Sequence, residues 1–302
     1  MNAKDFGLWL LLAWLWGSSF LAIGIGVTTM HPFSLVSARM VIGALFLLVV
    51  LGIRGGSLGL GVTGWATALV VGLSGNVAPF LLISYAEQSV PSGVAALIMG
   101  IAPVVTLTVA PLTHESEVLT RSKMIGAVIG FAGIVILVGP NAVEGVGGDL
   151  LPRLALTGAA LCYAFTALFS RRFPYPNPLS MAAASVLIGA ILITALTALT
   201  GTYSFSEISP ESALAAIYLG AGPTALAALI YFTLIPRVGA GRLQQVNYVV
   251  PVLGLVLGVM FLGERPTWNA ISAVPVILVA VWFVAGGPKK PATTDKMERH
   301  SS

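Results

Sequence analysis

This chain has few charged residues. Only 9% of its 302 residues are charged, whereas 57% are apolar, and a soluble globular protein carries roughly 25% charged residues. So few charges cannot cover the surface of a water-soluble fold, so lipid must solvate much of the chain. The composition therefore predicts an all-α polytopic membrane protein. At roughly 20 residues per span, ten transmembrane helices would use about 200 residues and leave short loops.

Other absences exclude whole classes of protein. The single cysteine, Cys162, excludes an internal disulfide and lies in an apolar run. No phosphate-binding Walker A sequence, His-Glu-x-x-His pair or Cys/His cluster is present, so we expect neither an ATP-binding phosphate loop nor a metal. Acids, histidines and lysines do not converge at one depth. We therefore expect no enzyme, no cofactor and no nucleic-acid partner.

The apolar residues fall into ten runs. They are Phe6–Val27, Phe33–Leu51, Gly61–Tyr85, Gly93–Leu112, Met124–Gly139, Leu151–Phe169, Leu179–Thr200, Glu211–Ile235, Gly241–Gly263 and Thr267–Ala285. A polar tail, residues 289–302, follows the last run.

The cations are distributed unevenly between the two sets of loops. The N-terminus, the even-numbered loops and the C-terminus hold 12 of the 15 Lys and Arg residues. The opposite loops hold Arg153 and Arg265, and Arg39 lies inside the second run. Cytoplasmic loops are enriched in Lys and Arg. We therefore expect a bacterial inner-membrane protein with both termini in the cytoplasm, which requires an even number of spans.

The two halves of the chain resemble each other at an offset of 146 to 148 residues. Residues 93–103 (GVAALIMGIAP) align with residues 241–251 (GRLQQVNYVVP), and each segment is followed by a glutamate, Glu115 or Glu264. The pattern predicts a first repeat in residues 1–140 and a second in residues 150–288. Five spans per repeat is an odd number, so the second copy must be inverted relative to the first. Inverted repeats around a central cavity are typical of secondary transporters.

Several short motifs resemble the EamA family of the drug/metabolite transporter superfamily. They are Trp-Gly-Ser-Ser-Phe at 16–20, Pro32 with Arg39, the prolines of the fourth and ninth runs, and Leu-Gly-Glu at 262–264. The first-half counterpart of the last motif is degraded to Thr-His-Glu at 113–115. The resemblance covers nearly the whole chain. It implies ten helices in two five-helix repeats around a central cavity.

The chain looks most similar, within that family, to bacterial exporters of aromatic and other amino acids. We therefore expect export of small amphipathic metabolites, most of all neutral amino acids, by alternating access. A sugar-like, polyamine or drug-like substrate is the alternative, followed by a membrane protein without transport. The expected partners are a small-molecule substrate and the bilayer, with the monomer as the functional unit. The Gly-x-x-x-Gly pairs at 126/130 and 254/258 fit internal packing or a dimer interface.

Arg39 is the charge that needs explaining. It follows Pro32 by seven residues, or roughly 10 Å of helix, and a charge near a helix centre costs about 2.5–3.5 kcal/mol on insertion scales. Its repeat counterpart is Ser185. It could attract a substrate carboxylate, or it could extend outward or bind carbonyls, Glu87 or Glu264.

The remaining candidates for the cavity wall are neutral. Asn76 aligns with Thr224, and the nearby Pro79 and Pro223 are hinge candidates because proline interrupts the helical hydrogen bonds. One further group of candidates shares a face of the ninth run: Gln244, Asn247 and Tyr248. A second group could form an apolar wall with polar tips: Ser18, Met99, Tyr163 and Tyr231. Hydrogen bonding between helices is the alternative for the ninth-run face, and ordinary packing would explain the wall residues equally well.

Every Asp and Glu lies at the end of a span, in a loop or in a tail. Proton-coupled carriers often use a carboxylate within the membrane. The pattern therefore favours facilitated diffusion or exchange, although a glutamate at a span end could still titrate.

Overall fold

The computed structural model describes residues 2–102, 104–106, 109, 121–138, 150–172, 177–203, 207–238, 243 and 246–285. Within these residues the regular structure is entirely helical. The helices of the first half are α1 (Ala3–Gly26), α2 (Pro32–Ile53), α3 (Gly61–Gly72), α4 (Ala78–Ala86), α5 (Ser92–Met99) and α7 (Arg121–Val138). Those of the second half are α9 (Leu150–Arg172), α10 (Pro178–Thr200), α11 (Pro210–Leu219), α12 (Ala227–Val238), α14 (Val246–Leu262) and α15 (Trp268–Ala285).

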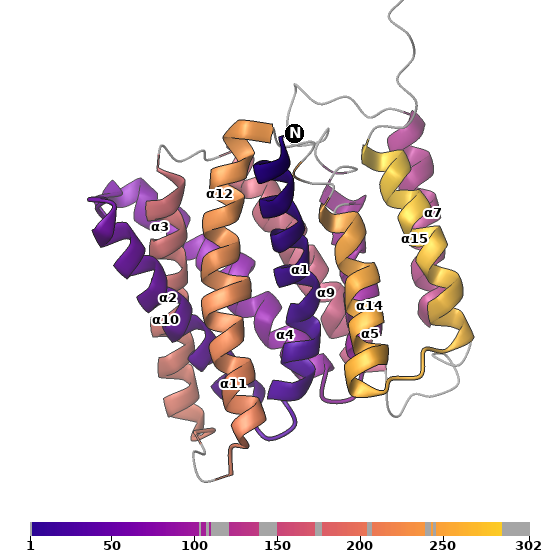
Figure 1. The fold of residues 1–302 in the computed structure, drawn as a ribbon, viewed down its shortest axis with the longest axis horizontal. Coiled ribbons are helices and arrows are strands. Elements are labelled where there is room, and N and C mark those ends of the chain that lie inside the picture. Colours follow the sequence, from indigo (N-terminus) through magenta and orange to yellow (C-terminus); the bar gives the residue numbers. More distant parts are fainter. Residues whose placement is uncertain are drawn as a thin grey trace, which may run out of the picture.

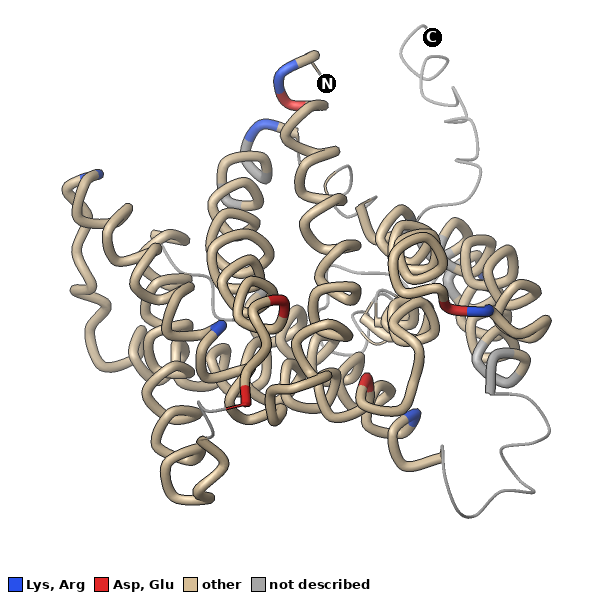
Figure 2. Tube along the Cα trace, turned by 60° about the horizontal axis from the view of Figure 1, so that its bottom comes forward, with Lys and Arg blue, Asp and Glu red and all other residues tan. Residues whose placement is uncertain are grey.

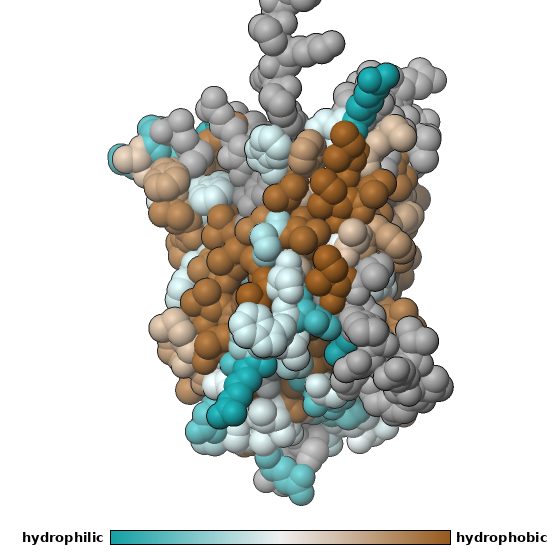
Figure 3. Space-filling model, turned by 90° about the vertical axis from the view of Figure 1, so that its right-hand side faces the viewer, coloured by the Kyte–Doolittle hydropathy of each residue, from teal (hydrophilic) through white to brown (hydrophobic). Residues whose placement is uncertain are grey.

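The helical segments agree with the ten predicted spans. In the described part of the chain, 6 helices are long and apolar enough to cross a membrane. Shorter apolar helices at Ser92–Thr106, Met124–Gly133, Val249–Leu262 and Trp268–Ala280 occupy the remaining predicted positions. In Figure 3, hydrophobic residues cover the middle of the visible face and hydrophilic residues gather toward its two ends. This banding is what a bilayer requires of a spanning bundle.

The two halves interlock instead of standing apart. α1 packs on α11, α12 and α14 of the second half, α2 packs on α10, and α4 packs on α9. α5 packs on α14, and α7 pairs with α15 at one edge of the bundle (right side of Figure 1). Each helix of the first half therefore has its main neighbour in the second half.

Local sequence explains where several helices begin. Asn2, Asn177 and Ser209 each accept a hydrogen bond from the backbone N–H three residues later. Proline occupies the first positions of α2, α10 and α11. A short polar cap and a proline without an N–H suit this position, because the first N–H groups of a helix have no partner within it. Most charged residues also lie at or near helix ends (Figure 2).

Both halves contain a wide helical turn at equivalent positions. The π-helical turn η1 (Leu73–Val77) joins α3 to α4, and η2 (Gly220–Leu226) joins α11 to α12. Pro79 follows η1 closely and Pro223 lies inside η2. Because proline cannot donate to the preceding turn, the local hydrogen-bond register changes. The prediction that these prolines interrupt their helices agrees with the structure, whereas their role as hinges remains a prediction.

Candidate functional site

Arg39 lies buried on α2, between the two halves. Its side chain is 5% exposed, so it does not extend to the surface of the bundle. Its Nε donates a hydrogen bond to Thr224 Oγ1 at 2.8 Å, and its guanidinium carbon lies 3.6 Å from the centre of the Phe80 ring. The aromatic face and the hydroxyl compensate part of the cost of burying the cation. One neighbour comes from each half of the chain.

Thr224 is positioned by the proline next to it. A regular helix would bond the N–H of residue 223 to the carbonyl of Leu219, but Pro223 has no N–H. The Thr224 hydroxyl donates to that carbonyl at 2.8 Å and uses a lone pair to accept from Arg39. The proline therefore shifts the register so that the Leu219 carbonyl faces residue 224, and the hydroxyl held there accepts from the arginine.

Glycines let α2 and α10 approach the wide turns closely, in a pattern that repeats between the halves. A Cβ at Gly43 would lie 3.4 Å from the Gly220 carbonyl oxygen, and one at Gly189 would lie 3.6 Å from the Gly72 carbonyl oxygen. The two contacts are related by the offset of 146 to 148 residues. Arg39 lies four residues before Gly43, just as Ser185 lies four residues before Gly189.

The second contact carries no cation. Ser185 is buried and donates to the carbonyl of Ala182 at 3.1 Å. Asn76, the counterpart of Thr224, lies half-buried in η1. Tyr163, on α9, is partly buried between the two main hydrophobic clusters. Arg39, Asn76 and Tyr163 thus lie on helices that meet at the boundary of the two halves.

The other predicted wall residues have mixed positions. Ser18 is buried and shares a 2.6 Å hydrogen bond with the Tyr218 hydroxyl of α11. Tyr231 lies beside Trp16, with ring centroids 6.1 Å apart. Met99 is buried in the core, Asn247 is half-buried, Gln244 lies outside the described residues, and Tyr248 is described only in its backbone.

Two glutamates lie close together at the end of the bundle opposite the N-terminus. Glu264 Oε1 accepts hydrogen bonds from the Ser92 N–H at 2.6 Å and the Ser92 hydroxyl at 2.7 Å, and its Oε2 accepts from the Gly93 N–H at 3.0 Å. This carboxylate caps the N-terminus of α5, where the helix dipole favours negative charge. Glu264 therefore has a structural partner other than Arg39.

Glu87 has a different environment. It follows the last residue of α4, is 8% exposed, and neither of its carboxyl oxygens has a hydrogen-bond partner among the described residues. Burial and the nearby Glu264 raise the pKa of Glu87 well above its ordinary value, while Arg39 and the Gly24 backbone act in the opposite direction. The sequence places Glu87 at the end of a span but does not reveal that its side chain is buried. A signal was available, since Glu87 lies two helical turns after Phe80 and so shares the face that meets Arg39.

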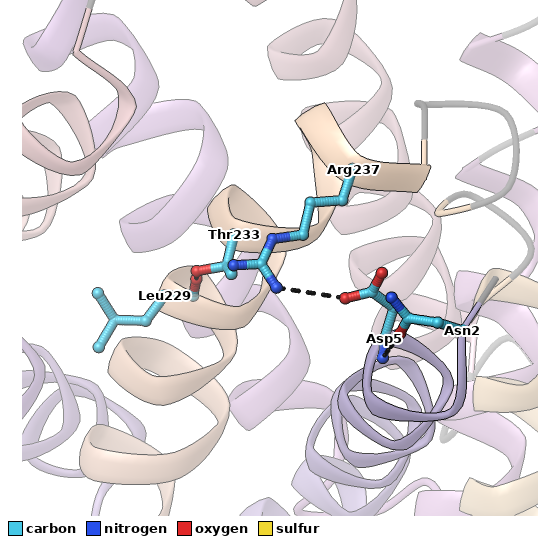
Figure 4. A network of polar contacts seen from close by, with 5 residues as sticks. All are labelled: Asn2, Asp5, Leu229, Thr233 and Arg237. Carbon is cyan, nitrogen blue, oxygen red and sulfur yellow. Dashed lines mark hydrogen bonds and ion pairs between the residues drawn. The ribbon is translucent and has the colours of Figure 1, made fainter.

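Polar contacts join the halves at both ends of α1. Near the N-terminus, Arg237 Nη1 of α12 lies 3.3 Å from Asp5 Oδ1 (Figure 4). At the other end, Thr29 donates to Ser212 Oγ at 2.8 Å, and Ser212 donates to the Ile25 carbonyl at 3.0 Å. Both sets of contacts join α1 to the helical segment that contains η2.

A cavity of about 520 Å³ lies away from these polar residues. It is lined by apolar side chains of α3, η1 and α10, among them Leu69, Leu73 and Leu196. An apolar groove between helices suits a lipid chain, and it does not contain the Arg39 cluster. The described residues contain no group of three or more His, Cys, Asp or Glu that could hold a metal ion.

Comparison with known proteins identifies the class. The model of the EamA-like transporter family matches residues 6–139 and 151–286. The chain therefore belongs to the EamA-like transporter family, within the drug/metabolite transporter superfamily, and it is a membrane transporter by family. The two matched segments correspond to the two halves that pack against each other in the structure.

Two relatives match over most of the chain. The uncharacterized inner membrane transporter YedA of Escherichia coli (strain K12) is 27% identical over 302 residues, covering 98% of this chain and 97% of the relative. The uncharacterized transporter YoaV of Bacillus subtilis (strain 168) is 22% identical, covering 89% and 92%. A protein crystal structure has the same fold, with a TM-score of 0.68 at 20% identity, covering 94% of this chain and 98% of that one.

Proposed function

We propose that the chain is a secondary carrier that exports small amphipathic metabolites, with neutral and aromatic amino acids as the favoured substrates. The observation that carries this proposal is the buried Arg39, held between Phe80 of the first half and Thr224 of the second. An arginine whose fixed partners are neutral retains its positive charge for a carboxylate. Movement of the two halves relative to each other would then change the site itself.

The other candidate wall residues have side chains that suit a zwitterion with an aromatic or aliphatic side chain. Asn76 and Tyr163 carry an amide and a phenol on helices at the boundary of the halves, and Met99 and the Trp16–Tyr231 pair carry a thioether and aromatic rings. A binding site in a membrane carrier is commonly apolar with a few polar groups that fix orientation. The predicted face of Gln244, Asn247 and Tyr248 would extend this wall.

The orientation is part of the proposal. The excess of Lys and Arg in the N-terminus, the even-numbered loops and the C-terminal tail supports an inner-membrane protein with both termini in the cytoplasm. The Asp5–Arg237 pair then lies at the cytoplasmic end, and Glu87 and Glu264 lie at the periplasmic end. Contacts between the halves at both ends suit alternating access, in which one set opens while the other stays closed. The monomer is proposed to be sufficient, since Gly130 and Gly254 make their close contacts within the chain.

A counterflow assay in proteoliposomes tests the substrate class. Purified protein is reconstituted, loaded with one unlabelled compound, and tested for exchange against labelled amino acids, sugars, polyamines and nucleotide sugars. Exchange of neutral amino acids is expected. Failure of every amino acid to exchange, with reconstitution verified, would exclude this class and favour the sugar-like, polyamine or drug-like alternatives.

Substitution of Arg39 tests its role. Arg39→Ala should weaken exchange of an amino acid by at least tenfold, because a charged hydrogen bond contributes about 1.5–3 kcal/mol. Arg39→Lys should retain part of the activity, since it preserves the charge but loses the planar donor group. The matched control is Arg54→Ala, at the exposed end of the same helix. A correctly folded Arg39→Ala protein with normal exchange would contradict the carboxylate role.

A further inference from the structure

We infer that Glu87 is a proton-binding site whose occupancy is linked to carboxylate binding at Arg39. The link rests on the proposed function, whereas proton binding by Glu87 does not. In this step the Glu87 carboxylate takes one proton from a hydronium ion at its end of the bundle: an O–H bond forms on the carboxylate, an O–H bond of the hydronium breaks, and a neutral carboxylic acid and a water molecule result. No other bond forms or breaks.

The first support is the lack of compensation around this carboxyl group. It is 8% exposed, and neither oxygen has a hydrogen-bond partner among the described residues. An ionised carboxylate in such a place loses hydration and gains at most one backbone contact, at Gly24, which favours the protonated form. Glu264, nearby, gives the contrast, because three donors hold its carboxylate. The two carboxyl groups at this end of the bundle therefore differ sharply in the hydrogen-bond donors around them.

The second support is the position of the carboxyl group between the halves. A Cβ at Gly24 of α1 would lie 3.5 Å from Glu87 Oε2 and 3.8 Å from Ser92 Cβ. Ser92 in turn donates to Glu264, which follows α14 of the second half. Glu87 thus lies where α1, α4 and α5 meet the loop after α14. These helices belong to the interface that must change if the halves move.

The charges that act on Glu87 come from two sides. Glu264 faces it from the loop after α14, and Arg39 faces it from α2. α9, packed on α4, contributes Tyr163, which interacts with Arg39. From α1, the element closest to the carboxyl oxygens is the backbone at Gly24. One like charge and one opposite charge therefore determine how easily the proton binds and leaves.

Arg39 makes the link to a carboxylate substrate. Ionised Glu87 is favoured by the positive charge of Arg39, and an anion bound to Arg39 cancels that attraction. Carboxylate binding should then increase the affinity of Glu87 for a proton, and protonation should increase carboxylate affinity by the same factor. Phe80, beneath Arg39, precedes Glu87 by seven residues, or roughly 10 Å of helix. For charges at that spacing in a partly buried site we expect a factor on the order of ten.

Infrared difference titration of the reconstituted full chain tests proton binding without any substrate. The wild type should show a protonated-carboxyl C=O band that disappears as pH rises. Glu87→Gln should lack this band, Glu87→Asp should keep it at a shifted frequency, and the control Glu211→Gln should leave it unchanged, since Glu211 is exposed. No titrating band in the wild type, or an unchanged band in folded Glu87→Gln protein, would overturn the assignment.

Binding of L-phenylalanine at different pH values tests the link. Its affinity for the wild type should fall about tenfold as the infrared band disappears, and its affinity for Glu87→Gln should be the same across that range. Affinity that stays constant in the wild type, although the band titrates and L-phenylalanine binds, would refute the linkage. If L-phenylalanine does not bind at any pH, the substrate proposal fails, while the infrared result still decides whether Glu87 binds a proton. Replacement of sodium by potassium should not move the band; a shift would assign the site to a metal cation instead.

Discussion

Replacement of Glu264 should destabilise the bundle through one identifiable contact. Its carboxylate receives hydrogen bonds at 2.6, 2.7 and 3.0 Å from the first residues of α5. A hydrogen bond to a charged group contributes about 1.5–3 kcal/mol, and the helix dipole adds about 0.3–1 kcal/mol. These contributions are not additive, since Glu264 is half-buried and water can replace it in part. For Glu264→Ala we expect a loss of about 2–4 kcal/mol.

Reversible unfolding in mixed detergent micelles, followed by tryptophan fluorescence, measures this loss. Glu264→Gln should be intermediate, because the amide keeps one acceptor oxygen but turns an N–H₂ toward one of the backbone donors. The matched control is Glu211→Ala, which removes an exposed glutamate from the first turn of α11 and should change stability little. If Glu264→Ala unfolds with the wild-type midpoint and slope, the cap does not stabilise the fold and the reasoning is refuted.

Two further predictions concern the contacts between the halves. A double-mutant cycle on Asp5→Asn and Arg237→Ala should give a coupling below about 1 kcal/mol that decreases with salt, because the Arg237 side chain is 55% exposed; a coupling above that value at high salt would contradict a screened pair. Gly72→Ala should cost about 1–3 kcal/mol, because its Cβ would lie 2.6 Å from the Ser185 backbone oxygen. Gly52→Ala, which meets nothing within 4 Å, is the control, and equal thermal stability of the two variants would show that the contact at Gly72 is not tight.

Much of the fold could be predicted because lipid imposes a simple rule on sequence. A spanning segment must be apolar and long enough, so the run Phe33–Leu51 predicts α2, observed at Pro32–Ile53. Proline adds a local rule, and Pro223 correctly marked the interruption of its helix. The offset between the halves correctly paired Asn76 with Thr224, which lie in the two wide turns. Hydropathy, proline and the internal repeat can all be read from the sequence without knowing which helices pack together, and for that reason they predicted the helices and their interruptions.

The partners of the candidate site could not be predicted in the same way. Hydropathy does not distinguish a helix face that meets lipid from one that meets protein, so the contact between Arg39 and Phe80 needs the packed structure. The burial of Glu87 was missed for the same reason, since a glutamate at a span end usually reaches water. Nor could sequence alone choose between Arg39 binding Glu264 and Glu264 capping α5. That choice depends on which donors the fold brings within 3 Å of the carboxylate.

The broken symmetry at Arg39 would give the proposed site a fixed orientation for its substrate. Both halves use a glycine contact to bring a helix against a wide turn, but one contact holds Arg39 with Thr224 and the other holds Ser185 beside η1, which carries Asn76. A strictly symmetric pair would place either two cations or none at the boundary. Two buried cations would repel each other, and none would leave a substrate carboxylate without a counter-charge. On the proposed function, a single arginine with one nearby acid would allow a zwitterion to bind in one orientation, because its carboxylate would meet only one positive group.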